Sequence, residues 1–376
     1  MTSDRNRIEK LTDRDSSKVD PGRNGLVVAL LVFSLLILTS ILTLAQDGGG
    51  IPIKTDRLSE NVLFFNTGET SALTNVVAIR TDDGVVVIDT SPSFDSAVRI
   101  RSSIEEVFGQ VSIPYVLYTH AAFDHTIGIE AFDGAVSIGQ VRGVSEIEQI
   151  NGQLFDPGFR DQIQTAMDGL RQQVEDASDD PRRQKAMKEM MESIEALVRD
   201  CDSGILFTVP TITFDDSLTL RAGGTTFDIN TCVISYSESD VLIHIPEERV
   251  LVVGDVFNKG RLPMISERSD IPRWKELFQP YLSGERPLDH IIGGHGDLLA
   301  LEDIRSQMEY IDALYRSIRS AREDGVDTEG IRAQHAFELF GHLSGYDTTF
   351  HGMPGNIHES NVQNIITMIE NELEGG

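Results

Sequence analysis

The stretch YTHAAFDHTIG, residues 118–128, places two histidines and an aspartate within a few positions of one another. It continues the apolar run IPYVLYTH (113–120), which predicts a strand that turns into a loop. Imidazole and carboxylate side chains together suit zinc or a similar divalent metal. His120, Asp124 and His125 therefore predict part of a metal site, with helix capping and core hydrogen bonding as the ordinary alternative for such residues.

Two later stretches repeat this pattern of a ligand-type residue at the end of an apolar strand. VLVVGDVF places Asp255 just after Gly254, and IIGGHGD places His295 in a glycine-lined loop. Loops at strand ends are where a rigid scaffold presents functional groups. Three such places in one chain favour a common site over core packing.

In this order, the pieces resemble the metallo-β-lactamase-fold hydrolase superfamily. That family carries His-x-His-x-Asp-His after a strand, then a lone His, an Asp after Gly and a final His. The stretch NVVAIRTDDGVVVIDTSPS (75–93), with Asp89, is similar to the family's opening strands. The resemblance covers about residues 56–300. It implies an α/β fold, a four-layer αββα sandwich that binds one or two metal ions at one edge of its sheets.

The match is unequal between the family's two metal sites. Ala122 stands at the second histidine of the motif, and counting back from the later aspartate places Tyr236 at the lone histidine. The first site keeps only His120 of its three histidines, and zinc sites normally need at least three protein ligands. The second site is complete, with Asp124, His125, Asp255 and His295. The resemblance therefore implies one ion at the second site, zinc first, with iron or manganese as alternatives.

A metal at this site implies roles for the neighbouring side chains. It lowers the pKa of a ligated water and polarises a carbonyl or phosphoryl oxygen of the substrate. Asp124 is expected to bind the metal and to accept the water's proton. His120 is expected to act as a base or substrate donor, or to be only structural. Tyr236 is expected to donate to a developing oxyanion or to fill the vacated first site.

Two functions of different classes follow. The first is a metal-dependent hydrolase of a small-molecule ester, lactone, amide, phosphoester or sulfate ester. The second is a catalytically degenerate relative that acts as a binding or structural module. The complete second site favours the hydrolase, whereas the loss of two first-site histidines favours the degenerate module.

The rest of the chain predicts sheets interrupted and then followed by helices. Inside the 56–300 domain, residues of about 152–200 change to helical spacing, and Pro181 opens the second of two amphipathic runs. An inserted helical hairpin is therefore expected there. A C-terminal helical region is expected at 301–376.

The N-terminal part predicts a membrane anchor. Gly25 to Ala45 carries no charge and is long enough to cross a bilayer as one helix. Basic residues before it and Asp47 after it predict a cytoplasmic tail at 1–24, an anchor at 25–46 and a linker at 47–55. The domain would then lie in the periplasm or outside, held in the inner membrane. A signal peptide cut near TLAQ (43–46), giving a secreted protein, is the alternative.

Composition restricts the partners and the redox chemistry. The formal net charge is -28, which repels nucleic acid and anionic lipid, so a small-molecule substrate is expected. The sequence leaves the oligomeric state open. The chain has only two cysteines, Cys201 and Cys232, which are expected to be free buried thiols, with a disulfide in an oxidising compartment as the alternative.

Overall fold

The computed structural model describes residues 50–375 apart from 69, 71–72, 155, 233–236, 336–339, 344 and 350–355. The chain divides into two units, Met1–Leu35 and Leu36–Gly376, and every described residue belongs to the second. The predicted membrane segment and Tyr236 lie outside the described residues. Among those that are described, no helix combines the length and the apolar character needed to cross a membrane.

The first sheet has seven strands in sequence order. They are β1 (Ile53–Arg57), β2 (Val62–Thr67), β3 (Asn75–Thr81), β4 (Gly84–Ile88), β5 (Tyr115–Leu117), β6 (Val136–Gln140) and β7 (Ile212–Phe214). Strands β1 to β4 pair antiparallel, and β4 to β7 pair parallel. Parallel neighbours end at the same edge, so the residues that follow β4 and β5 are brought close together.

The second sheet has five strands in the order β12-β11-β10-β9-β8. They are β8 (Ser217–Ala222), β9 (Thr225–Thr231), β10 (Val241–Ile245), β11 (Val250–Gly254) and β12 (His290–Gly293). Its only parallel pair among the described strands is β11 with β12. The loops that follow these two strands therefore leave the sheet at the same edge.

Alternating side chains build a core between the two sheets and a core on each outer face. The inner core joins Val62, Phe64, Val77 and Ile79 of the first sheet to Phe227, Ile229, Ile243 and Val252 of the second. Their sequence neighbours Leu63, Phe65, Val76 and Ala78 face the other way and pack with α2 (Phe94–Phe108). This follows from the two-residue period of a strand, which sends successive side chains to opposite faces.

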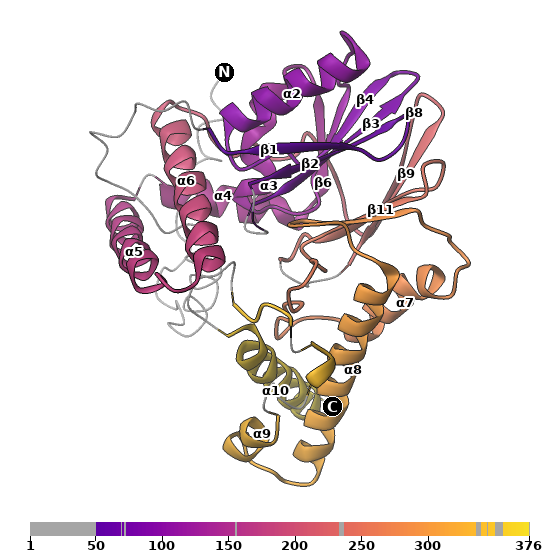
Figure 1. Ribbon diagram of the computed structural model, residues 1–376. Helices are drawn as coiled ribbons and strands as arrows, with labels where there is room; N and C mark the ends of the chain where they lie inside the picture. Colours follow the sequence, from indigo (N-terminus) through magenta and orange to yellow (C-terminus); the bar gives the residue numbers. More distant parts are fainter. Residues whose placement is uncertain are drawn as a thin grey trace, which may run out of the picture. The chain divides into compact units, whose positions relative to one another are not determined.

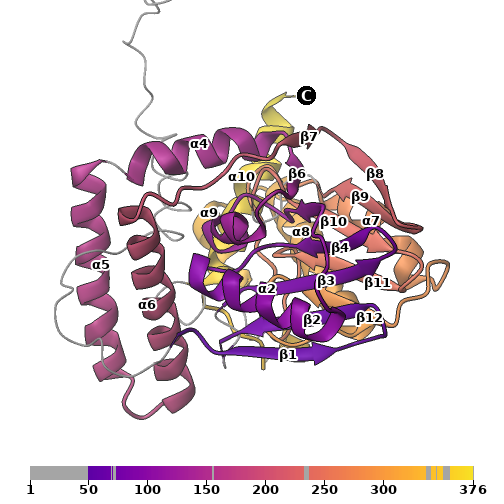
Figure 2. The same ribbon diagram turned by 90° about the horizontal axis from the view of Figure 1, so that it is seen from above.

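The outer face of the second sheet is covered by helices from the C-terminal third of the chain. Leu251 and Val253 pack with side chains of α7 (Ile271–Leu282), α8 (Leu301–Glu323) and α10 (Ile357–Gly375). Helix α9 (Thr328–Gln334) lies between α8 and α10 in the sequence. The layers therefore run helix, sheet, sheet, helix (Figures 1 and 2), in agreement with the predicted αββα arrangement.

The helical hairpin predicted at about 152–200 is formed by α5 (Pro157–Asp176) and α6 (Pro181–Asp202), which lie side by side in both views (Figures 1 and 2). The helix α4 (Arg142–Leu154) precedes it. The side chains of Asp156 and Asp180 cap α5 and α6, each followed by proline at the first helical position. Pro181 thus begins α6, as predicted from the sequence.

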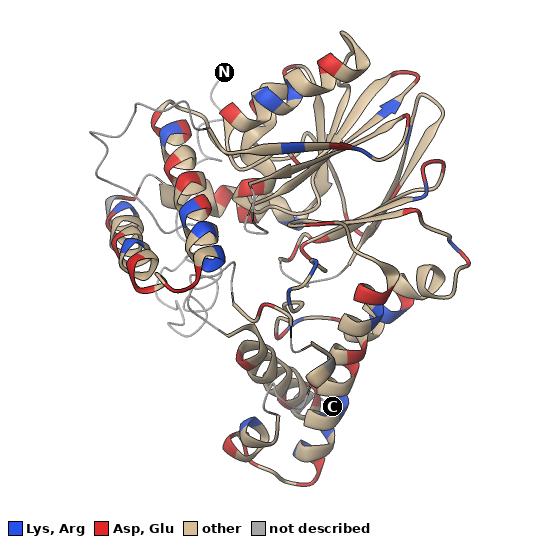
Figure 3. Ribbon diagram, viewed as in Figure 1, with Lys and Arg blue, Asp and Glu red and all other residues tan. Residues whose placement is uncertain are grey.

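Two carboxyl groups of α6 fasten the insert to the sandwich. Glu189 of α6, which is 4% exposed, accepts hydrogen bonds from the amide and the hydroxyl of Thr70. Asp200 accepts a hydrogen bond of 2.7 Å from the amide of Phe94 at the start of α2. Helices α5 and α6 also carry many acidic and basic residues (Figure 3). Solvent screens the interactions between these exposed charges.

One apolar run whose composition favours a single strand is divided between the two sheets. The run ITFDDSLTL (212–220) forms β7 in the first sheet and β8 in the second, with Asp215 and Asp216 at the turn between them. The backbone carbonyls of these aspartates accept hydrogen bonds from the hydroxyl and the amide of Thr231 on β9. Helices α2 and α7 are not predicted from the sequence. Both cysteines are free and buried, as expected from the sequence.

Candidate metal centre

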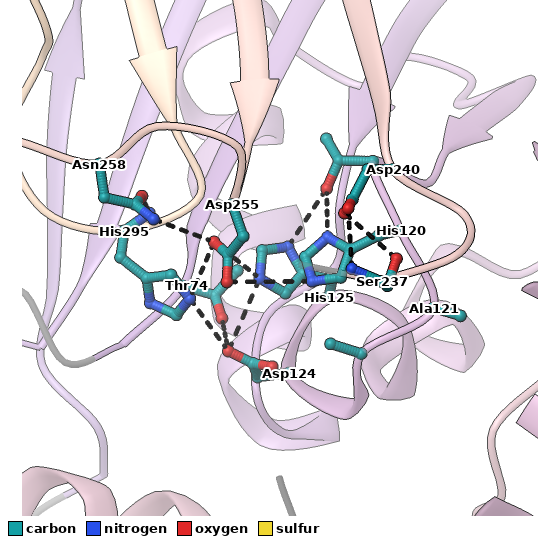
Figure 4. A network of polar contacts seen from close by, with 12 residues as sticks. Thr74, His120, Ala121, Asp124, His125, Ser237, Asp240, Asp255, Asn258 and His295 are labelled. Atoms are coloured by element: carbon teal, nitrogen blue, oxygen red, sulfur yellow. Dashed lines mark hydrogen bonds and ion pairs between the residues drawn. The ribbon is translucent and has the colours of Figure 1, made fainter. Parts of the chain in front are cut away.

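The four residues of the predicted second site meet at the edge where strands β4, β5, β11 and β12 end (Figure 4). Asp124 and His125 lie on the short helix α3 (Phe123–Thr126), Asp255 follows β11, and His295 follows β12. Nε2 of His295 lies 3.6 Å from Oδ2 of Asp124 and 3.2 Å from Oδ1 of Asp255. Nε2 of His125 lies 3.7 Å and 3.9 Å from the same two oxygens.

These separations fit a shared cation. Donors bound to zinc at roughly 2.1 Å in a tetrahedron lie about 3.4 Å from one another. The four nitrogen-to-oxygen separations range from 3.2 to 3.9 Å, which brackets that value. Among the described residues, the buried Nε2 of His125 has no hydrogen-bond partner. A buried nitrogen of this kind, aimed at two carboxylates, suits a divalent ion.

Asp89 fixes the orientation of the His125 ring. It follows β4, and its Oδ2 accepts a hydrogen bond of 2.8 Å from Nδ1 of His125. The amide and hydroxyl of Thr119 donate to the same carboxylate, each at 2.8 Å. With Nδ1 committed to Asp89, Nε2 is the nitrogen that faces the site. The sequence marks Asp89 as part of a motif but does not indicate this role, because His125 lies 36 positions away.

The electrostatics of the site show a shortage of positive charge. Burial alone would lower the pKa of His125, but Asp89, Asp124 and Asp255 outweigh it and raise the pKa to about 10. Burial alone would raise the pKa of Asp255, but His295 and His125 hold it well below its usual range. A proton on His125 therefore balances the carboxylates, and a divalent cation in the same place would do so more fully.

Glycine and asparagine residues allow His295 to approach Asp255. A Cβ atom on Gly294 would lie 2.0 Å from Oδ1 of Asp255, so only glycine fits there. Oδ1 of Asn258 accepts a hydrogen bond of 2.8 Å from the amide of His295. Asn75 also holds this loop, since its amide donates to the carbonyl of Gly294 at 2.7 Å. The sequence around Gly294, Asn258 and Asn75 does not indicate these contacts, because each contact joins residues that are distant in sequence.

His120 lies beside this cluster, next to Asp255. Its Nε2 is 4.0 Å from Oδ2 of Asp255, and its ring centroid is 4.1 Å from that of His125. The Thr119 hydroxyl donates to Asp89, so it accepts from Nδ1 of His120 at 3.0 Å. Burial, reinforced by His125, lowers the pKa of His120 to about 4. His120 is therefore a neutral imidazole whose Nε2 lone pair faces Asp255.

The described residues form two overlapping groups of three possible metal donors. His120, His125 and Asp255 lie close enough to share an ion, as do Asp124, His125 and His295. His125 belongs to both groups, but its Nε2 has one lone pair and can bind only one ion. Ala122, at the start of α3, offers no ligand atom. Tyr236, the residue aligned with the lone histidine, lies outside the described part of the chain.

Comparisons with known proteins agree on the fold. No curated protein matches the sequence. The sec-alkylsulfatase Pisa1 from Pseudomonas sp. has a similar structure, with a TM-score of 0.53 and 15% identity over 81% of this chain and 48% of that one. A double mutant of the same enzyme gives a TM-score of 0.55 and 16% identity over 80% and 48%. The chain thus spans about half the length of these alkylsulfatases.

A metallo-β-lactamase from Pontibacter korlensis is also similar, with a TM-score of 0.45 and 14% identity over 69% of this chain and 99% of that one. At such identities the similarity concerns the fold alone. The family model described as the metallo-beta-lactamase superfamily matches residues 71–195, which include Asp89, His120, Asp124 and His125. With its two packed sheets, its outer helices and its ligand-type residues at the shared strand edge, this chain is a metallo-β-lactamase-fold protein.

Proposed function

We propose that this protein is a hydrolase that works with one divalent metal ion, zinc, held by Asp124, His125, Asp255 and His295. Members of the metallo-β-lactamase superfamily are mostly metal-dependent hydrolases, which supports the reaction class. The observation that carries the proposal is the convergence of two carboxylates and two imidazoles from three separate strand ends. This ligand set, with two imidazole nitrogens and two carboxylate oxygens, suits zinc and also fits iron or manganese.

A bound cation of this kind supplies Lewis acidity, which lowers the pKa of water and polarises the oxygen of a scissile bond. The protein's own residues hold and move the proton. The side chain of Asp124 is 14% exposed, whereas those of His125, His295 and Asp255 are 0%, 2% and 4% exposed. Asp124 is thus the carboxylate most open to water, and it is the proposed proton acceptor.

His120 is proposed as a second proton acceptor or as a contact to the substrate. Its neutral ring presents Nε2 toward the carboxylate of Asp255, beside the cluster. Tyr236 is proposed as a donor to the developing oxyanion. That role is supported by its alignment with the family's lone histidine.

The proposed substrate is a small molecule with an ester, lactone, amide, phosphoester or sulfate ester bond. The similar structure of a sec-alkylsulfatase supports the sulfate ester within this range through the shared fold. The second candidate function is a binding or structural module that keeps the fold and one ion without turnover. It is favoured by Ala122 and Tyr236, which remove two of the family's first-site imidazoles.

We further propose that residues 25–46 anchor the chain in the inner membrane and that the domain lies in the periplasm or outside. The uncharged run and the basic residues before it support this placement. Cleavage near residues 43–46 would release the same domain as a secreted protein. The charge of -28 supports a small-molecule substrate and argues against nucleic acid as a partner.

Metal analysis of the purified protein tests the site. We expect about one zinc per chain in the wild type and none in Asp124→Ala or His295→Ala. His290→Ala is the matched control, because His290 opens the strand that His295 follows. A wild type without bound metal would contradict the proposal. Assays with generic ester, lactone, phosphodiester and sulfate ester substrates, with and without a chelator, then separate the hydrolase from the degenerate module.

A further inference from the structure

We propose that Thr74 is a positioning residue of the metal centre. It holds two ligands, Asp124 and His295, in position relative to each other. The inference rests on the metal site of the proposed function and goes beyond its ligands. Thr74 directly precedes β3 in the first sheet and is fully buried. Nothing in its local sequence marks it, since threonine before a strand is ordinary.

The side chain of Thr74 contacts one ligand directly. Its Oγ1 donates a hydrogen bond of 2.5 Å to Oδ2 of Asp124. This is the same oxygen that lies 3.7 Å from Nε2 of His125 and 3.6 Å from Nε2 of His295. The hydroxyl therefore selects which carboxylate oxygen of Asp124 faces the two imidazoles.

The backbone of Thr74 meets the ligand from the opposite sheet. Thr74 and His295 form an isolated antiparallel bridge, although they lie in segments that belong to different sheets. The next residue, Asn75, continues the contact through its side-chain amide, which donates to the carbonyls of Gly293 and Gly296 at 3.0 and 2.9 Å. One residue thus touches Asp124 through its side chain and His295 through its main chain.

The position of Thr74 is itself fixed by the neighbouring strand β2. Its carbonyl accepts hydrogen bonds from the amide and the hydroxyl of Thr67 on β2, at 3.3 and 2.6 Å. The carbonyl is therefore held by Thr67. The hydroxyl of Thr74 has a single proton, which it donates to Asp124. Because Asp124 is the most exposed of the four ligands, it is also the one most free to rotate toward water. The Thr74 hydroxyl removes that freedom before a metal arrives.

Three variants of the full-length protein test this role. Thr74→Val removes the hydroxyl and keeps the branched shape, and Thr74→Ser keeps the hydroxyl. Thr231→Val is the matched control, because Thr231 is a buried threonine whose hydroxyl donates to the carbonyl of Asp215 at 2.7 Å, in the second sheet. Zinc affinity is measured by competition with a chromophoric chelator, and the thermal midpoint of the metal-free protein is recorded alongside.

Thr74→Val is expected to bind zinc about 10- to 100-fold more weakly than the wild type, the usual loss for a residue that supports a ligand. The zinc affinity of Thr74→Ser is expected to stay within about threefold of the wild type, because the hydroxyl is kept. Thr231→Val is expected to lower the thermal midpoint and to leave zinc affinity unchanged. A structural role alone would lower the midpoint in Thr74→Val without a change in affinity.

Wild-type affinity in Thr74→Val overturns the inference, and so does a Thr74→Ser variant as weak as Thr74→Val, which would assign the loss to packing. The readout is metal affinity and does not depend on turnover. A wild type that binds zinc but hydrolyses no substrate therefore contradicts only the proposed function, and the affinity series still decides the role of Thr74.

Discussion

Asp89 accepts a hydrogen bond from Nδ1 of His125 across 2.8 Å, with both side chains buried. The pair links the end of β4 to the helix that follows β5, two neighbouring parallel strands. The same carboxylate is held by the amide and hydroxyl of Thr119. The orientation of one proposed metal ligand is therefore decided by a residue 36 positions earlier in the chain.

Replacing Asp89 should weaken the metal site without removing a ligand. In Asp89→Asn, the negative charge that orients Nδ1–H of His125 is lost, and zinc affinity is expected to fall about 10- to 100-fold. Asparagine is the suitable substitute because Asp89 has φ of 61°, a conformation that asparagine tolerates. Competition with a chelator measures the effect. Unchanged affinity would show that the ring of His125 is held by its packing alone.

A single methyl group at Gly294 should abolish metal binding. In Gly294→Ala, the new Cβ would lie 2.0 Å from Oδ1 of Asp255, so either the Asp255 carboxylate or the loop that carries His295 must move, which separates two ligands. Metal content of the purified variant is the measurement. Gly169→Ala is the control: nothing lies within 4 Å of a Cβ at that position on α5, and the exchange should stabilise the fold by about 0.5–1 kcal/mol. Metal retention in Gly294→Ala would contradict the tight approach.

Two added imidazoles should rebuild the first site. The double variant Ala122→His with Tyr236→His adds donors to His120 and to Oδ2 of Asp255, which already face each other at 4.0 Å. The number of zinc ions per chain is expected to rise from about one to about two, since three or more protein ligands then meet there. Metal analysis at saturating zinc decides the result. A stoichiometry that stays at one argues against the alignment of Tyr236 with the lone histidine.

Glu146 on α4 should give the stability of the fold a measurable pH dependence. Its carboxylate accepts hydrogen bonds from Oγ of Ser239 at 2.6 Å and from the amide of Glu238 at 2.9 Å. Burial raises the pKa of Glu146 above its usual value despite these bonds. Between the usual and the raised value, the folded protein binds more protons than the unfolded chain. This contribution to the free energy of unfolding therefore decreases as the pH rises through that window.

The variant Glu146→Gln lacks this contribution. Its free energy of unfolding, relative to that of the wild type, is expected to increase with pH across the window and to level off above it. Urea unfolding of both proteins at a series of pH values gives the difference. A difference that is constant with pH would show that Glu146 does not titrate within the range covered.

Much of the fold could be predicted from local pattern. Continuous runs of β-branched and other apolar residues mark β3 and β4, and Pro181 and Leu301 mark the starts of α6 and α8. These features depend on neighbouring residues, which is why the sequence displays them. The division of residues 212–220 between two sheets has no such signal, because it depends on the pairing of β7 with β6 and of β8 with β9.

The candidate site divides in the same way. Its donors could be named from the sequence, because a histidine or carboxylate directly after an apolar strand is unusual unless the strand end is functional. The residues that support those donors could not be named. Thr74, Asn75 and Asn258 are common residue types, and their partners lie far away along the chain.

The sequence by itself determined which groups are available: two imidazoles and two carboxylates at strand ends, and an alanine where a further imidazole would stand. Only the tertiary structure decided that these groups meet, because the parallel pairs β4 with β5 and β11 with β12 end at one edge, where the two sheets pack face to face. Strand pairing is set by hydrogen bonds and burial between distant segments, so no local stretch of the chain contains that information.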